Sequence, residues 1–172
     1  QNQTTSCYLR LSNIHSGDGY GTQFLPRVNQ EVIVSFINGN PNKPVIIGSL
    51  HNGENKNPVN LPENKSKSFI KTNSMPQYED KVGYNELAFE DKRGNELLSL
   101  RAEKDYSLLA LNDENIHIQN NSNTLIDNDK EETIAHDSIL TVGNDLNENI
   151  KFNHISTVEK EKLTTVQEDY EL

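Results

Sequence analysis

The sequence predicts an all-β protein in which several short strands precede a repetitive β-structure. Two observations predict this. A period of eight residues runs through roughly the last seventy residues, pairing one apolar position with one Asn, Asp or Glu position. Before it, apolar runs of strand length alternate with turns rich in Asn, Gly and Pro, which is typical of small antiparallel sheets.

The period places an apolar residue at every eighth position, and we call this set the apolar stripe. Its members are Ala102, Ala110, Ile118, Ile126, Ile134, Val142, Ile150, Val158 and Val166. Three residues after each come Asp105, Asp113, Asn121, Asp129, Asp137, Asp145, Asn153, Glu161 and Asp169. An array of short identical units is the signature of a solenoid or a fibre.

The unit is a strand and not a helical segment. In a helix, residues eight apart move progressively around the axis, whereas residues seven or eleven apart stay on one side. The stripe is mainly β-branched and often preceded by Thr, as at Thr133 and Thr141, which favours strands. Asn and Asp favour turns because they tolerate left-handed dihedrals. We therefore predict a strand of about five residues and a corner of about three, formed by the Asn/Asp position.

One unit cannot enclose a core, because eight extended residues span only about 26 Å. Three units of one chain could make a 24-residue coil, as in a monomeric β-helix, or three chains could wind around one another. We favour three chains, because nine units would give a monomer only three coils with open sheet edges, an aggregation hazard. The prediction is an intertwined triple-stranded β-helix, a trimeric prism with the apolar stripe as its core.

The second inward position, two residues before the stripe, fits this core less well. It begins with Leu100, Leu108 and Ile116 but later contains Glu132 and Glu148. Three buried carboxylates at one level would require a cation or water. Either this position lies at a wet corner or the register is imperfect there.

Charge and composition narrow the functional classes. The chain has 172 residues, 33% hydrophobic residues, no Trp and a net charge of −10. Residues 1–100 hold ten acidic and ten basic side chains, and residues 101–172 hold sixteen and six, so the excess lies on the repeat. This disfavours nucleic-acid and anionic-membrane binding. Cys7 is the only cysteine, so no internal disulfide forms, and we see no signal peptide; we expect synthesis in the cytoplasm.

The segments before the repeat predict part of a small β-barrel. Residues 7–14 alternate like a strand, and EVIVSF (31–36) and VIIGSL (45–50) form a hairpin. We interpret GDGYG (17–21) as a loop between strands, because a dinucleotide-binding loop requires a following helix. Residues 54–82 contain three Pro and indicate a linker. In residues 84–100, two strands flank a DKRG turn.

These segments resemble the VgrG spike proteins of bacterial type VI secretion. The resemblance lies in CYLRLSN, GYG, FLPRVNQEVIVSFINGNPNKPVIIGSLHNGEN and YNELAFEDKRGNELLSLRAEKD, within residues 6–110. It implies three parts: the C-terminal part of an OB-fold domain (1–53), an extended linker (54–84) and a triple-stranded β-helix needle (85–172). Tyr20 stands where the family usually has Trp. The family's N-terminal hub domains and first OB strands are missing, so the resemblance implies a fragment of a larger protein.

The resemblance also implies a function and partners. It implies a homotrimer on a tube of Hcp rings, with a PAAR-repeat protein at its tip, that contraction drives with effector cargo through a target-cell envelope. Membrane contact would be transient, and export would need no N-terminal signal. We expect no enzyme activity, cofactor or nucleic-acid partner.

Three alternatives stay open at this point. The first is a phage-type tail spike that binds or degrades surface polysaccharide, although residues 101–172 have few aromatic residues. The second is a monomeric solenoid binding module. The third adds a metal: His154 shares its strand face with Val158, so three copies could form a three-His site, although a solvent-facing His is the simpler interpretation. A Cys7–His51 catalytic pair has little support, because a strand Cys and a loop His are ordinary.

Overall fold

The computed structural model describes residues 8–75 and 83–167 and confirms the all-β prediction. It contains eight strands and one short 3-10 turn, and the described residues include no α-helix. The chain divides into two units, Gln1–Asn112 and Asp113–Leu172, with all eight strands in the first. Within the described residues, no helix has the length and apolar character needed to cross a membrane.

The first sheet is built on the predicted hairpin. Strands β4 (Glu31–Phe36) and β5 (Pro44–Leu50) pair antiparallel, and the 3-10 turn Ile37–Gly39 starts the connection between them. Strand β1 (Arg10–Leu11) pairs parallel with β5, which gives the order β1-β5-β4. Within the predicted 7–14 strand, Arg10 and Leu11 form β1, and the Ser12 N–H donates to the Ile46 carbonyl at 2.8 Å; Cys7 lies outside the described residues.

The GDGYG segment is a hairpin. Strands β2 (Ser16–Gly17) and β3 (Tyr20–Gly21) pair antiparallel around a turn in which Gly19 has a φ of 80°. At Gly21, with a φ of 142°, a Cβ would lie 2.5 Å from the His15 carbonyl oxygen, so the close approach of the two backbones requires glycine there. The next regular element is the strand β4, so the helix that a dinucleotide-binding loop needs does not follow.

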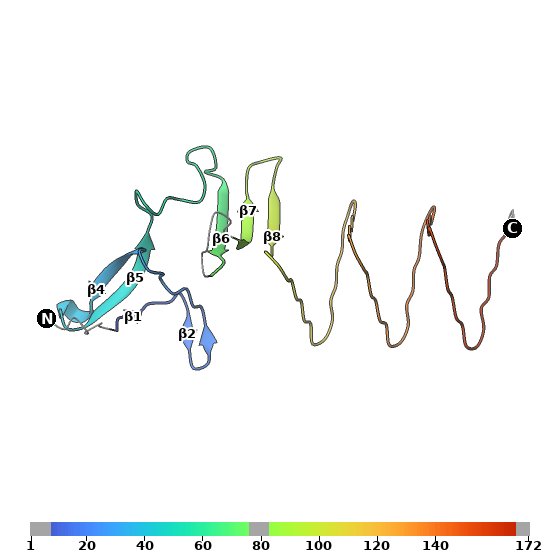
Figure 1. Cartoon of the computed structure of the whole chain (residues 1–172), viewed down its shortest axis with the longest axis horizontal. Helices are drawn as coiled ribbons and strands as arrows, with labels where there is room; N and C mark the ends of the chain where they lie inside the picture. The colour runs from blue at the N-terminus through green and yellow to red at the C-terminus, as the bar shows by residue number, and fades with distance from the viewer. Residues whose placement is uncertain (1–7, 76–82, 168–172) are drawn as a thin grey trace. The chain divides into compact units, whose positions relative to one another are not determined.

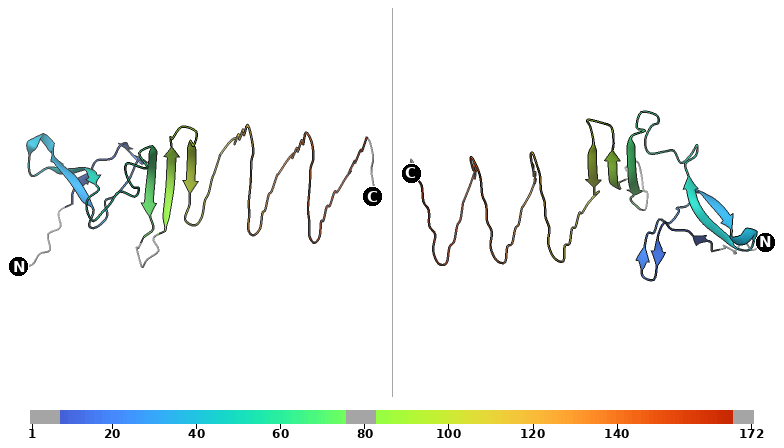
Figure 2. Two further views of the ribbon diagram at one scale, coloured as in Figure 1. Left: turned by 90° about the horizontal axis from the view of Figure 1, so that it is seen from above. Right: turned by 180° about the vertical axis from the view of Figure 1, so that it is seen from behind.

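The second sheet precedes the repeat. Strands β6 (Lys67–Asn73), β7 (Tyr84–Glu90) and β8 (Leu97–Arg101) lie side by side in the order β6-β7-β8, all antiparallel (Figures 1 and 2). The turn between β7 and β8 is the predicted DKRG turn, where Gly94 has a φ of 85°. The linker prediction was wrong for β6, whose sequence KSFIKTN alternates as a strand despite its two Lys.

The two faces of this second sheet differ in chemistry. Directly paired residues share a face, and one face carries Ile70, Leu87, Phe89, Leu98 and Leu100, which we call the apolar sheet face. The opposite face mixes charged side chains with Phe69, Tyr84 and Leu97. At its centre Ala88 lies between Phe69 and Ser99 and is the only buried hydrophobic residue of the described residues, 2% exposed. The apolar sheet face is uncovered in the single chain, with four of its side chains 43–64% exposed.

After β8 the chain follows the predicted eight-residue period. Two-residue bends occur at 103–104, 111–112, 119–120, 127–128, 135–136, 143–144, 151–152 and 159–160. Each bend starts directly after a stripe residue, and six extended residues separate it from the next. In the second unit the chain runs back and forth as an open coil (Figure 1).

The expected role of the Asn/Asp position was wrong in detail, because this position follows the bend and begins the next extended segment. The second bend position is often Asn instead, as at Asn128 and Asn144. Their side-chain amides donate hydrogen bonds to the carboxylates of Asp129 and Asp145, at 3.1 and 3.0 Å. Each such Asn-Asp pair therefore ties the end of a bend to the following segment.

The single chain leaves far more surface exposed than a folded monomer does. Its accessible surface is 18106 Å², whereas a compact monomer of 19.5 kDa would expose about 8,500 Å². With Ala88 as the only buried apolar side chain in the described residues, hydrophobic burial within one chain cannot offset the entropy cost of ordering it. Other chains must supply the missing burial.

Candidate trimer interface

The large residues of the apolar stripe are the most shielded apolar side chains of the repeat. From Ile118 to Val166 all seven are 42–50% exposed. Every other large apolar residue from 104 to 167 is at least 59% exposed, and Phe152 reaches 94%. Each stripe residue immediately precedes a bend, so neighbouring residues of the same chain cover about half of its side chain. The remaining half is available to other chains.

From residue 114 to 167, the main chain of the repeat also lacks hydrogen-bond partners within the described part of the chain. No main-chain hydrogen bond joins two of the described residues between 114 and 167. A monomeric β-helix would show a ladder between residues 24 apart, and the structure shows none over this range. Extended segments with unpaired N–H and C=O groups require a partner strand. The geometry therefore disfavours the monomeric solenoid and favours pairing between chains.

The structure shows a partner for one of the two carboxylates that the sequence placed at the second inward position. Glu132 lies two residues before Ile134, and its carboxylate accepts a 2.7 Å contact from the Lys130 ammonium, also on that face. This hydrogen bond and the charge of Lys130 lower the pKa of Glu132. Within one chain, Glu132 is therefore paired with a cation of its own chain, where the sequence had predicted an unpaired carboxylate.

A polar cluster ties the first bend of the repeat to the second sheet; we call it the Tyr84 cluster, formed by Tyr84, Asn85, Arg101 and Glu103. The Arg101 guanidinium lies 3.8 Å from the centre of the Tyr84 ring, donates to the Tyr84 carbonyl and pairs with Glu103 at 2.7 Å. The Glu103 carboxylate accepts from the Tyr84 N–H at 3.2 Å, and the Glu103 N–H donates to the Asn85 side chain at 2.9 Å. Lys71 covers the same ring at 3.7 Å.

The Tyr84 cluster makes stability depend on pH. The hydrogen bond from Arg101, and then that from the Tyr84 N–H, lower the pKa of Glu103 from its ordinary value of 4.5. Glu103 therefore stabilises the fold above pH 4.5, and this contribution is lost as the pH falls through the lowered pKa. We expect Glu103→Gln to lower the melting temperature at pH 7 by a few degrees at most, because the pair is exposed. The two proteins should converge as the pH falls below the lowered pKa of Glu103. A constant difference would contradict this, and Glu159→Gln is the control.

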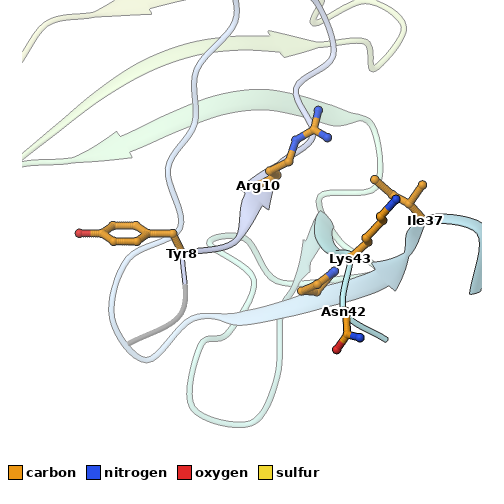
Figure 3. A pocket seen from close by; sticks show the side chains of 6 residues that line it. Tyr8, Arg10, Ile37, Asn42 and Lys43 are labelled. Atoms are coloured by element: carbon orange, nitrogen blue, oxygen red, sulfur yellow. The ribbon is translucent and has the colours of Figure 1, made fainter. Parts of the chain in front are cut away.

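Within the described residues of one chain, the candidate catalytic and metal sites lack the side chains that such chemistry needs. A cleft of about 560 Å³ is lined by Tyr8, Arg10, Ile37, Asn42, Lys43 and Pro44 (Figure 3). This lining has no carboxylate, thiol or imidazole for acid-base or nucleophilic chemistry. The His51 ring lies 3.3 Å from the Asn55 carbonyl, and its suggested partner Cys7 lies outside the described residues. The described part of one chain has no group of three potential metal ligands, and a site shared by three His154 stays a prediction.

Comparison with known proteins identifies the architecture. Residues 68–172 match the family model of the bacteriophage T4 gp5 C-terminal trimerisation domain. The chain belongs to this family. The match begins at β6 and includes the whole repeat, so this gp5-type trimerisation domain comprises both the apolar sheet face and the apolar stripe. Residues 1–51 match the type VI secretion system/phage-baseplate injector OB domain, which agrees with the predicted OB fold.

Curated relatives confirm the resemblance to VgrG. The chain is 37% identical over 126 residues to the type VI secretion system spike protein VgrG3 of Vibrio cholerae serotype O1. It is 39% identical over 114 residues to VgrG5 of Pseudomonas aeruginosa. These alignments cover 73% and 66% of this chain but only 12% and 14% of the relatives. A third relative, also from Vibrio cholerae serotype O1, is named actin cross-linking toxin VgrG1, with 37% identity over 73% of this chain and 11% of the relative.

Proposed function

We propose that this gp5-type chain forms, as a homotrimer, the shaft of a non-enzymatic puncturing spike of a type VI secretion system. The observation that carries the proposal is the repeat itself. Its extended segments have no main-chain partner within the chain from 114 to 167, and each ends in a half-covered apolar residue. Three chains would satisfy both needs, with neighbouring strands pairing and the nine residues of the apolar stripe meeting at the axis.

Such a prism suits the transmission of axial force. Every strand of the shaft would pair with strands of the other two chains, so no exposed edge and no soft hinge would remain. The excess of acidic over basic side chains lies on residues 101–172, and it would keep the exposed faces soluble. These properties are those of a stiff rod, and they need no catalytic group.

The relatives are named type VI secretion system spike proteins, and the finer parts of the proposal follow from the resemblance to that family. At its base the trimer would sit on a tube of Hcp rings, and at its tip it would carry a PAAR-repeat protein. Effector cargo would travel with it when contraction exports the assembly to the cell exterior or a target cell. The relative named as an actin cross-linking toxin suggests that this architecture can carry additional activities outside the part matched here.

Export tests this function directly. A bacterium producing the protein should release it into the medium, and a strain unable to assemble its contractile sheath should not. A cytoplasmic marker measured in the same fractions controls for lysis. Equal release from both strains would contradict the proposal, because the protein would then leave the cell by a route independent of contraction.

A further inference from the structure

An eight-residue repeat has a weakness that the rest of the chain must correct. If one chain of a trimer slides by one unit, each stripe residue meets another Ile, Val or Ala, and each Asp or Asn meets its equivalent. Only one unit at each end loses its partners. Registers of such self-similar strands are weakly specified, so the repeat alone would assemble into trimers with staggered chains.

The second sheet occurs only once in the chain, so its packing can specify a single alignment, which the repeat cannot. Its apolar sheet face groups Ile70, Leu87 and Leu100 in one row across the three strands, beside Phe89 and Leu98 in the next. Four of these side chains are 43–64% exposed, whereas on the opposite face Ala88 is buried, 2% exposed. An apolar patch left open on a sheet indicates an interface.

This face continues directly into the predicted trimer core. Leu98 and Leu100 of β8 alternate with outward residues, and the next residue on their side of the extended chain is Ala102, the first member of the apolar stripe. The occupant is therefore a second and a third copy of this chain. A slide of one strand spacing would bring Phe89 of one sheet to the level of Ser68 or Leu98 of the others, so the three Phe89 rings meet only when the sheets are level.

The Tyr84 cluster connects the sheet to the repeat. Through Glu103 it fixes the first bend to β7, with the Arg101 pair at 2.7 Å and the Asn85 hydrogen bond at 2.9 Å. A sheet aligned by its apolar face would thus set the height at which each chain begins its first extended segment. Alignment at the sheet would determine alignment along the shaft.

We propose that the β6-β7-β8 sheet is the register-setting element of the trimer, with its apolar face packing against the same face of two further copies. The proposal rests on the homotrimer proposed above and adds the means by which three self-similar strands are held level. It assigns to this sheet a role distinct from that of the apolar stripe, which supplies core burial at every level but no unique alignment.

Mixed trimers test this proposal without disturbing the sheet. A chain lacking residues 121–128, one complete unit, is refolded with the full chain, and trimers containing both are purified through two affinity tags. In a Cys7→Ser background, a nitroxide is placed at Ser107 or Asn147, equivalent exposed positions before and after the deletion. Pulsed electron paramagnetic resonance then measures the distances between labels.

If the sheet sets the register, Ser107 labels will give the single distance of the unmixed full-length trimer. Asn147 labels will give a second distance, because the shortened chain is displaced by one unit, a rise of about 4.8 Å onto another side of the prism. The reverse pattern, a split at Ser107 and one distance at Asn147, would overturn the proposal. A monomeric mass would overturn the homotrimer itself, so the two failures are distinguishable.

A matched pair of variants locates the effect in the apolar sheet face. Leu98→Asn with Leu100→Asn alters this face, whereas Leu109→Asn with Leu111→Asn alters equally apolar side chains that are 81% and 93% exposed. In full-length trimers labelled at Asn147, the first pair should give several distances and the second pair one. One distance in both, or loss of the trimer with the first pair, would show that this face does not act by alignment.

Discussion

Replacing Ile134 with Asp should abolish trimers that resist heat and detergent. Ile134 is a stripe residue in the middle of the repeat, 48% exposed in the single chain, and in the trimer three copies would meet at one level. The change removes about 1.5–3 kcal/mol of apolar burial per chain. It also places three carboxylates at the axis, each with a desolvation penalty of several kcal/mol. Gel electrophoresis of unboiled samples, with thermal unfolding followed by circular dichroism, measures the result.

The control for this change lies two residues away. His136 is the second residue of the bend that follows Ile134, and it is exposed. His136→Asp introduces the same carboxylate at a corner, so the resistant trimer should persist with a melting temperature within a few degrees of the unaltered protein. If the two variants behaved alike, Ile134 would not lie at the axis, and the assignment of the whole stripe would fail.

Deleting half of a repeat unit should damage the shaft more than deleting a whole unit. Without residues 121–124, one side of the prism would contain four residues instead of eight and would span about 13 Å instead of about 26 Å. All three chains would carry this short side, so pairing would be interrupted there. We expect the resistant trimer to be lost.

Deleting residues 121–128 removes a complete unit and provides the comparison. The stripe then passes from Ile118 to Ile134 with its spacing of eight intact, because Ile126 is lost with its own bend. This trimer should keep its resistance and lose only the stability of one level. Equal damage from both deletions would show that the eight-residue step is not the structural unit.

The period could be predicted from the sequence because each unit repeats the same local instructions. A mostly β-branched residue at the end of each segment, and a polar Asn, Asp or Glu residue after each bend, set strand and corner without information from distant residues. The position of the corner was missed by one or two residues, since Asn128 and Asn144 act before the Asp that marks the period. The trimer could be predicted because a single chain cannot bury the apolar stripe or pair its open strand edges.

The second sheet was harder to predict because its features depend on pairing. Lys67 and Lys71 made the segment resemble a linker, but β6 places Lys67 3.3 Å from Glu86 and Lys71 over the Tyr84 ring. Neither partner is near in sequence. The alternation of Ser68, Ile70 and Thr72 was the available signal, and it becomes an apolar face only beside Leu87 and Leu100.

The molar mass in solution tests the central claim most directly. Multi-angle light scattering on the full chain should give about three times 19.5 kDa, unchanged over a wide range of protein concentration, because the interface includes the core. A mass of 19.5 kDa would contradict the intertwined trimer, since a single chain exposing 18106 Å² would then have to be stable alone.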